Sequence, residues 1–252
     1  MRRPVAAMAK EFPDGAYVAP HSHPRAQLLF AARGVMRLAT PAEAWIVPPL
    51  RAVVIPAGTE HEIRMSGRVA MRTLYIAREA APWLPERCAV IEVSPLLREL
   101  ILVAVEEPVE YERGSRGELV MELILREVRA AASVPLHLPL PREPRLRALC
   151  AALLADPASP GTLDEWAARV GASSRTLVRL FRRETGLSFA LWRQQLRLAE
   201  AVSQLACGRA VGLVAEELGY RSASAFAAMF RRALGTTPKR YLAPAGPPSR
   251  RD

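Results

Sequence analysis

The spacing of apolar residues divides the chain near residue 94. Before that point, short apolar runs alternate with turns that contain glycine or proline, such as residues 56–58. Within residues 35–38 and 61–65, apolar and polar side chains exchange at each position, which is the period of a half-buried strand. Strands this short and this closely spaced predict a sandwich or a small barrel. The predicted strands span residues 27–32, 35–40, 43–47, 51–56, 61–65, 69–77 and 88–93.

Between residues 94 and 132 the apolar positions follow a helical period instead. Residues 96–104 and 118–132 each place their apolar side chains on one face of a helix. These two helices can cover the β domain, or they can pack against a second subunit. The segment 133–144 that follows contains four prolines and predicts a stiff, extended linker.

The rest of the chain is predicted to be helical up to residue 242, with a disordered tail at 243–252. Thr162 can cap the helix that starts at Leu163, and Glu165 follows at the third helical position, as in a capping box. The expected helices span residues 145–155, 163–170, a segment from a Ser173 or Ser174 cap to Thr185, 189–206, 212–218 and 222–234.

One unit occurs twice within residues 163–241. Gly171 and Gly219, 48 residues apart, each follow a short apolar helix, and Phe-Arg-Arg-x-x-Gly runs begin at Phe181 and Phe230, 49 residues apart. A short apolar helix, a glycine turn and a helix rich in serine, threonine and arginine form the pattern of a helix-turn-helix. We therefore predict helix-turn-helix units at 163–184 and 211–234. Their first helices are expected to bury Leu163, Trp166, Ala167 and Val170 in the first copy, and Leu213, Val214 and Leu218 in the second. The alternative is two hairpins of an ordinary helical domain, with arginines that are only solvated.

Charge separates the two halves of the chain. Of the formal net charge of +10, +9 lies in residues 141–252, which hold 18 basic and 9 acidic residues. Residues 1–140 hold 17 basic and 16 acidic residues. A general preference for arginine explains the type of cation but not this asymmetry. A nearly neutral half joined to a basic half indicates a sensing or assembling module joined to one that binds a polyanion.

The exposed faces of the repeated unit predict the DNA contacts. Residues at the start of its second helix should lie deepest in a major groove, and arginine suits both guanine edges and phosphate oxygens. In the second copy, Ala225 and Ala228 stand where the first has threonine and arginine, so we expect base reading by the first copy and backbone contact by the second. The predicted DNA-binding residues are Ser174, Arg175, Thr176, Arg179, Arg182 and Arg183, then Arg221, Ser222, Ser224, Arg231 and Arg232, and finally Lys239 and Arg240.

Several motifs of this half occur together in a known family. They are Leu163–Phe181 around Gly171, the connecting helix Phe189–Ala206, Val214-Ala215-x-x-Leu218-Gly219-Tyr220, Ser224-x-Phe226, Phe230-Arg231-Arg232 and Gly235-x-x-Pro238-x-x-Tyr241. With them, residues 143–242 resemble the DNA-binding domain of the AraC/XylS family of transcription regulators. The resemblance implies that the long helix holds both recognition helices, so that they enter successive major grooves on one face of the duplex. Phe189 departs from the proline that many members have there.

Three of the four histidines form a second pattern. Gly15-x5-His21-x-His23-x3-Gln27-x6-Gly34 is followed by Pro56-x-Gly58-x-x-His61. This pattern resembles the two signature motifs of the cupin family, a small β-barrel, which expects glutamate in place of Gln27 and often asparagine in place of Met65. Two histidines separated by one residue lie on the same face of a strand. A third imidazole from across the barrel can complete a three-nitrogen site.

Three interpretations of the histidine set stay open. It can hold a divalent metal for catalysis, as in cupin oxygenases; it can be a metal site or polar pocket that senses an effector; or its residues can only support the turns of the barrel. Because a carboxylate is missing, Fe(II) and Mn(II) are disfavoured, while Zn(II) and Ni(II) remain suitable. A DNA-binding module in the same chain favours sensing. The predicted effector-binding residues are His21, His23, Gln27, Trp45 and His61, and the predicted metal ligands are His21, His23 and His61.

Together these patterns predict an α+β multidomain protein. A cupin-like β-barrel at 1–93 is followed by a helical pair at 94–132, a proline-rich linker at 133–144 and an all-α double helix-turn-helix domain at 145–242. AraC-like regulators often join such a barrel to dimerising helices, so the resemblance favours a homodimer that binds double-stranded promoter DNA. It implies a one-component regulator controlled by a small molecule or a metal, with RNA polymerase as a further partner. The alternative is a metal-dependent cupin enzyme, of dioxygenase or isomerase type, with a helical appendage.

Cysteines and hydropathy indicate the compartment. Cys88, Cys150 and Cys207 form no C-x-x-C pair, which favours a reducing compartment. No apolar run approaches the length of a membrane span, and charged residues interrupt the apolar stretch that a signal peptide would need after Arg2-Arg3. We therefore expect a cytoplasmic protein without a membrane partner. The only cofactor that the sequence suggests is the Zn or Ni ion of the barrel.

Overall fold

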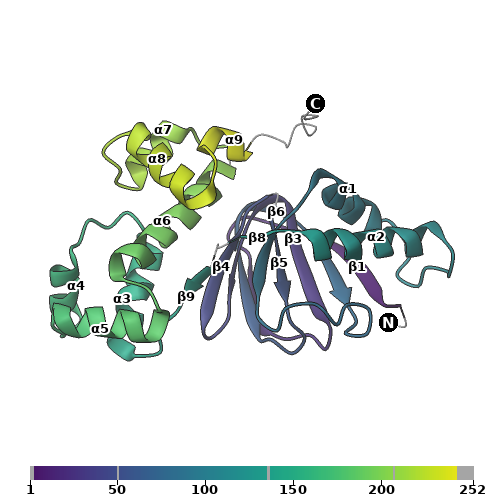
Figure 1. Cartoon of the computed structure of the whole chain (residues 1–252), viewed down its shortest axis with the longest axis horizontal. Helices are drawn as coiled ribbons and strands as arrows, with labels where there is room; N and C mark the ends of the chain where they lie inside the picture. Colours follow the sequence, from purple (N-terminus) through teal and green to yellow (C-terminus); the bar gives the residue numbers. More distant parts are fainter. Residues whose placement is uncertain (1–2, 50, 135–136, 207, 243–252) are drawn as a thin grey trace. The chain divides into compact units, whose positions relative to one another are not determined.

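The computed structural model describes residues 3–49, 51–134, 137–206 and 208–242 (Figure 1). The chain divides into two compact units. Of the described residues, those up to Thr40 and those from 47 to 134 belong to the first unit, whereas residues 41–46 and 137–242 belong to the second. Within the described residues, no helix has both the length and the apolar character needed to cross a membrane.

The first unit contains an open antiparallel sheet. Its strands follow the order β1-β6-β3-β5-β7-β8, and β2 pairs with β6. No pairing joins β1 to β8 among the residues that the structure describes, so the two ends of this order stay apart. The strands are β1 (Val5–Phe12), β2 (Tyr17–His21), β3 (Ala26–Ala39), β5 (Arg51–Ile55), β6 (His61–Ile76), β7 (Ala89–Glu92) and β8 (Ser133–Val134).

The two longest strands, β3 and β6, each continue through a glycine. Gly34 and Gly67 have positive φ angles of 77° and 72°. The register between the two strands shifts on either side of Arg33. We predicted that both glycines mark turns between separate strands, and this is wrong. They form bulges inside continuous strands, because a bulge and a turn both draw on the left-handed backbone that glycine adopts readily.

Two helices lie on one face of this sheet (Figure 1). α1 (Pro95–Ala104) starts after Ser94, whose hydroxyl accepts the N–H of Leu97, and α2 (Arg116–Ala130) starts after Ser115 in the same way. These serine caps satisfy N–H groups that the first turn of a helix leaves unpaired.

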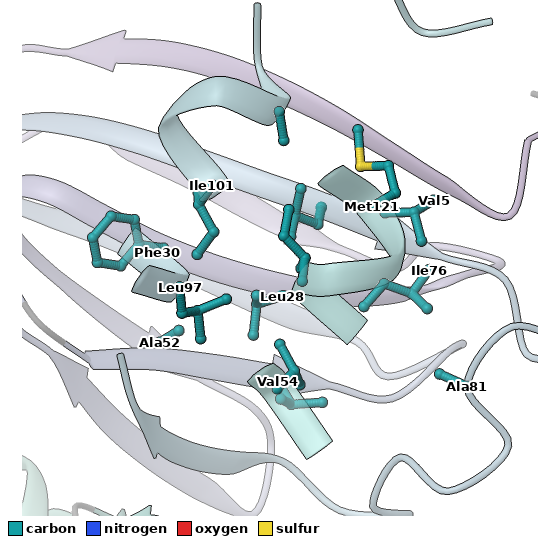
Figure 2. Close-up of a cluster of buried hydrophobic side chains, with 14 of the residues drawn as sticks. Val5, Leu28, Phe30, Ala52, Val54, Ile76, Ala81, Leu97, Ile101 and Met121 are labelled. Atoms are coloured by element: carbon teal, nitrogen blue, oxygen red, sulfur yellow. The ribbon is translucent and has the colours of Figure 1, made fainter. Parts of the chain in front are cut away.

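A hydrophobic core joins the helices to the sheet. Figure 2 shows Leu97 and Ile101 of α1 gathered with Leu28 and Phe30 of β3, and all four are 1% exposed or less. Because neighbouring side chains of a strand point to opposite faces, Gln27 lies on the face of β3 that these helices do not cover. The histidine site is built on that other face.

The second unit is helical apart from one short ladder. That ladder pairs β4 (Glu43–Val47) with β9 (His137–Pro139). The helices are α3 (Pro144–Ala155), α4 (Leu163–Arg169), α5 (Ser174–Thr185), α6 (Phe189–Ala206), α7 (Val211–Glu217), α8 (Ala223–Leu234) and α9 (Pro238–Leu242). The capping box of Thr162 and Glu165 at the start of α4 is formed as predicted.

Helix α6 belongs to two hydrophobic cores at once. Trp192 and Leu196, in its first half, are buried in a core with α3, α4 and α5. Leu198 and Val202, in its second half, are buried in a core with α7, α8 and α9. The long helix is therefore the common wall of the two repeated units.

The predicted α+β class is confirmed, with a sheet-rich first part and a helical second part, while the strand pairings of the described residues form an open sheet and not the closed barrel that was predicted. The predicted helices agree with the structure to within two residues at each end. Two short strands, β8 and β9, occur in the segment predicted as an extended linker, since an extended backbone can also pair as a strand. Leu213 was expected in the core, but its side chain is 54% exposed, whereas Val214 and Leu218 are buried as predicted. Cys150 is buried as expected and Cys88 is half-buried; the predicted tail at 243–252 and Cys207 lie outside the described residues.

The bulge at Gly34 predicts a large cost for a side chain there. A Cβ at Gly34 would lie 2.5 Å from the carbonyl oxygen of Arg68, whereas one at Gly15, with a similar φ of 72°, would meet no atom within 4 Å. A left-handed residue with a Cβ costs about 1–2 kcal/mol, and forcing atoms into a packed site adds about 1–3 kcal/mol. Urea unfolding should therefore show that Gly34→Ala destabilises the protein by at least about 1 kcal/mol more than Gly15→Ala. Equal losses from the two substitutions would show that the bulge tolerates a side chain.

Candidate DNA-binding interface and histidine cluster

The two helix-turn-helix units have the same turn. In the first, Gly171 has φ 66° and the N–H of Ala172 donates to the carbonyl of Ala167 at 2.9 Å. In the second, Gly219 has φ 74° and the N–H of Tyr220 donates to the carbonyl of Ala215 at 2.9 Å. The hydrogen bond recurs with the 48-residue spacing of the sequence repeat. Glycine is needed at this point because the turn requires a left-handed residue.

The second helix of each unit also starts and ends alike. Ser173 accepts the N–H of Thr176 at 3.1 Å before α5, and Ser222 accepts the N–H of Ala225 at 3.1 Å before α8. Both helices end at a left-handed glycine, Gly186 in the first copy and Gly235 in the second. Equal length and equal capping make α5 and α8 equivalent elements.

The outer face of α5 is basic. Arg175, Arg179, Arg182 and Arg183 are exposed, while Leu177, Leu180 and Phe181 are buried against the core. Among the described residues, no hydrogen bond or ion pair holds Arg175 or Arg179. These two arginines can therefore reach outward from the first two turns of the helix.

Two predicted base-reading hydroxyls already have partners. Ser174 donates to the carboxylate of Asp164, and the hydroxyls of Ser173 and Thr176 lie 2.9 Å apart. Both Ser174 and Thr176 are half-buried. Either hydroxyl would have to exchange its partner in order to contact a base.

The end of α5 is fixed to the start of α3. Glu184 accepts the backbone N–H groups of Arg142 and Glu143, each at 2.9 Å, and forms an ion pair with Arg183 at 3.0 Å. The N–H of Glu143 is the main reason why the pKa of Glu184 lies below its usual range. Arg183 is thus partly engaged, whereas Arg182 next to it is exposed.

The outer face of α8 carries less chemistry at its start. Ser224 and Ala225 are exposed, Ala228 is half-buried, and Ser222 is engaged as the cap. Cations stand before and after this stretch, at exposed positions: Arg221, Arg231, Arg232, Lys239 and Arg240. Lys239 and Arg240 lie on the short helix α9, whose first turn is capped by Thr237.

The three predicted histidines lie close together in the sheet-rich compact unit. His21 at the end of β2 is the register partner of His61 at the start of β6, and His23 follows β2. The ring centroids are 4.4 Å apart for His21 and His61, 4.9 Å for His21 and His23, and 5.6 Å for His23 and His61. One ring nitrogen from each lies within 4.8 Å of the others.

Backbone carbonyls fix the protonation of two of these rings. The Nδ1 of His21 lies 2.7 Å from the carbonyl oxygen of Ala19, and the Nδ1 of His61 lies 2.9 Å from that of Thr59. Because a carbonyl only accepts, each Nδ1 carries the hydrogen, and in the neutral ring Nε2 keeps its lone pair. The Nε2 atoms of His23 and His61 are buried without a hydrogen-bond partner.

Burial favours the neutral form of His23 and His61. Desolvation is the main cause that lowers the pKa of His61, and it outweighs the opposing hydrogen bond to Thr59. Desolvation also lowers the pKa of His23, with a further contribution from the charge of His21. A neutral imidazole with an unshared lone pair is the form that binds a metal or accepts a hydrogen bond from a ligand.

Gln27 is buried with a polar group still unsatisfied. Its amide nitrogen donates to the hydroxyl of Thr73 at 2.9 Å, while its Oε1 has no partner. Tyr75 is the register partner of Gln27 and also contacts the ring of His23, with the ring centroids 4.9 Å apart. Sequence reasoning missed Thr73 and Tyr75, although their spacing within β6 places both on the same face of the strand. Trp45 is 2% exposed and lies on the part of β4 that belongs to the second unit; its role in an effector site stays a prediction.

Known protein families match both the sheet-rich part and the helical part of the chain. A model of the AraC-like ligand binding domain matches residues 4–190, and a model of a helix-turn-helix domain matches residues 166–243. The HTH-type transcriptional regulator NimR of Escherichia coli K12 is 36% identical over 223 residues, which cover 88% of this chain and 81% of NimR. The HTH-type transcriptional regulator RipA of Corynebacterium glutamicum is 38% identical over 103 residues, which cover 41% of this chain and 31% of RipA.

Among solved structures, that of fatty-acid-bound ToxT from Vibrio cholerae matches 96% of this chain and 97% of its own, at 10% identity and a TM-score of 0.39. The curated relatives are transcription regulators rather than enzymes. The match to the ligand-binding model over more than half of the chain, together with the match to NimR, establishes that this chain belongs to the AraC family of DNA-binding transcription regulators and carries an AraC-like ligand-binding domain.

Proposed function

We propose that the protein is a one-component regulator that binds promoter DNA sequence-specifically through α5 and α8, placed in successive major grooves. The observation that carries this proposal is the equivalence of the two units, which share their turn, their caps and their attachment to α6. Two equivalent recognition helices on one rigid connector suit a duplex, whose major groove recurs every helical turn of about 34 Å.

We assign direct base reading mainly to α5. Arg175 and Arg179 are exposed near its start, and a guanidinium can donate to both acceptors of a guanine edge. Arg182 and Arg183, near the other end, are assigned to phosphate oxygens. Ser174 and Thr176 are assigned secondary contacts because their hydroxyls already have partners in the protein.

We assign contacts with the DNA backbone mainly to the second helix-turn-helix unit. At the start of α8, alanines replace the residue types that distinguish bases, and the exposed cations stand on either side of them. Ser222 and Ser224 are assigned contacts at this start of the helix. Arg221, Arg231, Arg232, Lys239 and Arg240 are assigned to phosphates, and shape-dependent fit supplies the remaining selectivity.

Substitution of Arg179 and of Lys239 should have different effects. Arg179→Ala removes a base contact, so it should cost about 1–3 kcal/mol on the preferred site and relax sequence preference. Lys239→Ala removes a phosphate contact, so it should weaken all sequences alike and reduce the slope of log K against log salt by about one. Gel-shift titrations can measure both, on a duplex selected from a random library by the full-length protein.

A matched control is Arg147→Ala, which removes the same charge from an exposed position on α3. It should change affinity less than either variant. If Arg179→Ala kept the wild-type sequence preference, the assignment of base reading to α5 would be wrong.

We propose that the histidine cluster of the first unit is the effector site. The cupin resemblance implies a metal there, and the residues fit one: the Nε2 atoms of His23 and His61 are buried without partners, and two of the rings are oriented by backbone carbonyls. His21, His23 and His61 would hold Zn(II) or Ni(II), with Gln27 as a neutral oxygen nearby. A metal held in this way would be a fixed positive charge to which an effector can bind. A small molecule that donates hydrogen bonds to the same nitrogens is the second candidate.

Metal content separates these two candidates. After incubation with Zn(II) and gel filtration, the full-length protein should retain about one ion per chain, because three imidazoles meet in one place. His21→Ala should lose the ion, while His137→Ala, which changes the one histidine outside the cluster, should retain it. Elemental analysis measures both. Less than about 0.1 ion per wild-type chain would reject the metal and leave the small molecule.

We propose that α1 and α2 form a homodimer interface with a second copy. Both helices bury one face in the first unit, yet Leu96, Leu119 and Leu123 are 53%, 57% and 45% exposed. Leu119 and Leu123 are neighbours on α2, because residues four apart lie on the same side of a helix. A twofold contact would pair this surface with its own copy and join two DNA-binding units, which raises affinity through effective concentration.

Dimerisation can be tested with Leu119→Arg combined with Leu123→Arg. Charges in an apolar interface lose hydration without a partner, so light scattering should show a monomer where the wild type is a dimer. Met8→Arg is the control, since Met8 is an exposed apolar residue of the same unit on β1, at 40%. A dimer that persists in the double variant would place the interface elsewhere.

Binding to a promoter implies a further partner and a compartment. RNA polymerase is the partner that a regulator meets at a promoter, and the cytoplasm is the compartment in which a bacterial-type chromosome is read. The effector is the ligand whose binding to the sheet-rich unit changes how the helical unit binds DNA.

A further inference from the structure

Two arginines of α6 face the loop that leads into the first helix-turn-helix unit. Arg193 and Arg197 are four residues apart, so they lie on the same side of the helix. The loop joins α3 to α4 and ends at Thr162, the cap of α4. From their type and their place in a basic domain, both arginines would count as candidates for phosphate contact.

The structure instead commits both guanidinium groups to backbone carbonyls. Arg193 donates to the carbonyl of Gly161 at 2.8 Å and to that of Ser159. Arg197 donates to the carbonyl of Pro157 at 3.0 Å and to that of Ala158 at 3.2 Å. Four carbonyls of one short loop are thus held by two side chains. We call this arrangement of Arg193, Arg197 and residues 157–161 the arginine clamp.

The clamp places two like charges side by side in a half-buried place. Burial lowers the pKa of Arg193, and the neighbouring charge of Arg197 lowers it further. Such an arrangement is unfavourable unless the donors are satisfied, because a buried charge without hydrogen bonds costs far more than an exposed one. The carbonyls supply that compensation for the two terminal nitrogens of Arg193 and for the Nε and one terminal nitrogen of Arg197, while the Nε of Arg193 is buried without a partner. Lysine cannot replace arginine here, since it lacks the planar fork that reaches two acceptors at once.

The turn of the second helix-turn-helix unit reaches the same place. A Cβ at Gly219 would lie 3.6 Å from a terminal nitrogen of Arg197 and 3.7 Å from the carbonyl oxygen of Ala158. The charge of Arg197 also acts on Tyr220, the residue after that glycine. Arg197 therefore binds the loop before the first helix-turn-helix unit and lies beside the turn of the second.

The position of the clamp on α6 strengthens this connection. Leu196 belongs to the core of the first helix-turn-helix unit and Leu198 to the core of the second. Arg197 lies between them on α6, at the point where one core ends and the other begins. Each core holds its own helices against α6. The clamp ties the loop before α4 to α6 at this junction, beside the turn of the second helix-turn-helix unit.

We propose that Arg193 and Arg197 are positioning residues that hold the two recognition helices in one fixed relation, so that both units can bind a duplex at once. This inference rests on the proposed binding of successive grooves. A rigid pair of units binds a full site much more tightly than either unit binds half of it, because linkage makes the second contact intramolecular. Without the clamp each helix-turn-helix unit keeps its own turn, its DNA-facing residues and its core against α6, but the loop before α4 is no longer held beside the turn of the second unit.

The test compares full and half sites with Arg197→Lys in the full-length protein. The probes are the library-selected duplex and two shortened duplexes that each keep the footprint of one unit. The variant keeps the charge and loses the carbonyl contacts. Its affinity for the full duplex should fall on the order of tenfold, part of the gain of about 10²–10⁴ that linkage can give. Its affinity for each half should change less than about twofold.

Arg193→Lys tests the same clamp from its other side and should reproduce the result. Arg147→Lys, an exposed arginine of α3, is the matched control and should leave all three duplexes unaffected. Hydrogen exchange gives a readout without DNA: the amides of Ala158, Ser159 and Gly161 should exchange about tenfold faster in either clamp variant, since exchange reports local opening. Exchange in the buried parts of α5 and α8 should stay slow, which separates loss of the clamp from loss of the fold.

Different results overturn different claims. If both clamp variants kept wild-type affinity for the full duplex, the positioning role would be wrong while binding of two grooves stood. Equal losses on the full duplex and on a half duplex would identify a direct DNA contact and would also overturn it. If the wild type bound the full duplex no better than its halves, binding of two grooves would fail, and the inference would fail with it.

Discussion

The burial of α6 between two hydrophobic cores is the constraint on which the DNA-binding half depends. Its first half packs Trp192 into one core, and its second half packs Val202 into the other. Because a helix is stiff along its axis, neither unit can shift along α6 without giving up buried apolar surface. With 18 residues, α6 is roughly 27 Å long at the usual rise per residue. That length is comparable to one turn of B-form DNA, which is why a single helix can serve both units.

The helical half follows closely from its sequence. Its signals are local: glycines that end helices, serine and threonine caps, and an apolar stripe that recurs on each helix. Because the unit repeats after 48 residues, each of these signals occurs at an equivalent position in the second copy. Leu213 is the exception. Both Leu213 and Val214 suit a buried face by type, and only the packing of α7 decides that Val214 is inside. The carbonyl contacts of Arg193 and Arg197 have no sequence signal, because a cation in a basic domain reads as a surface residue.

The sheet was harder to predict for a physical reason. β1 contains three alanines among eight residues and does not alternate, so its pairing with β6 comes from tertiary contact rather than from its own pattern. Gly34 and Gly67 show that a left-handed glycine identifies a break in regular backbone without saying whether the chain turns back or continues. The meeting of His21, His23 and His61 was predictable, because their spacing matches a known motif. The carbonyls that orient His21 and His61, and the unsatisfied oxygen of Gln27, have no signal in the sequence, because they depend on how the loops and strands pack.

The central claim is that one chain places two equivalent recognition helices in successive major grooves. Hydroxyl-radical footprinting of the full-length protein on its selected duplex tests this most directly. The account predicts, for the pair of helix-turn-helix units in each bound chain, two protected tracts on one face of the duplex, with centres about 10–10.5 base pairs apart. A single protected tract of one groove, or two tracts on opposite faces, would contradict it.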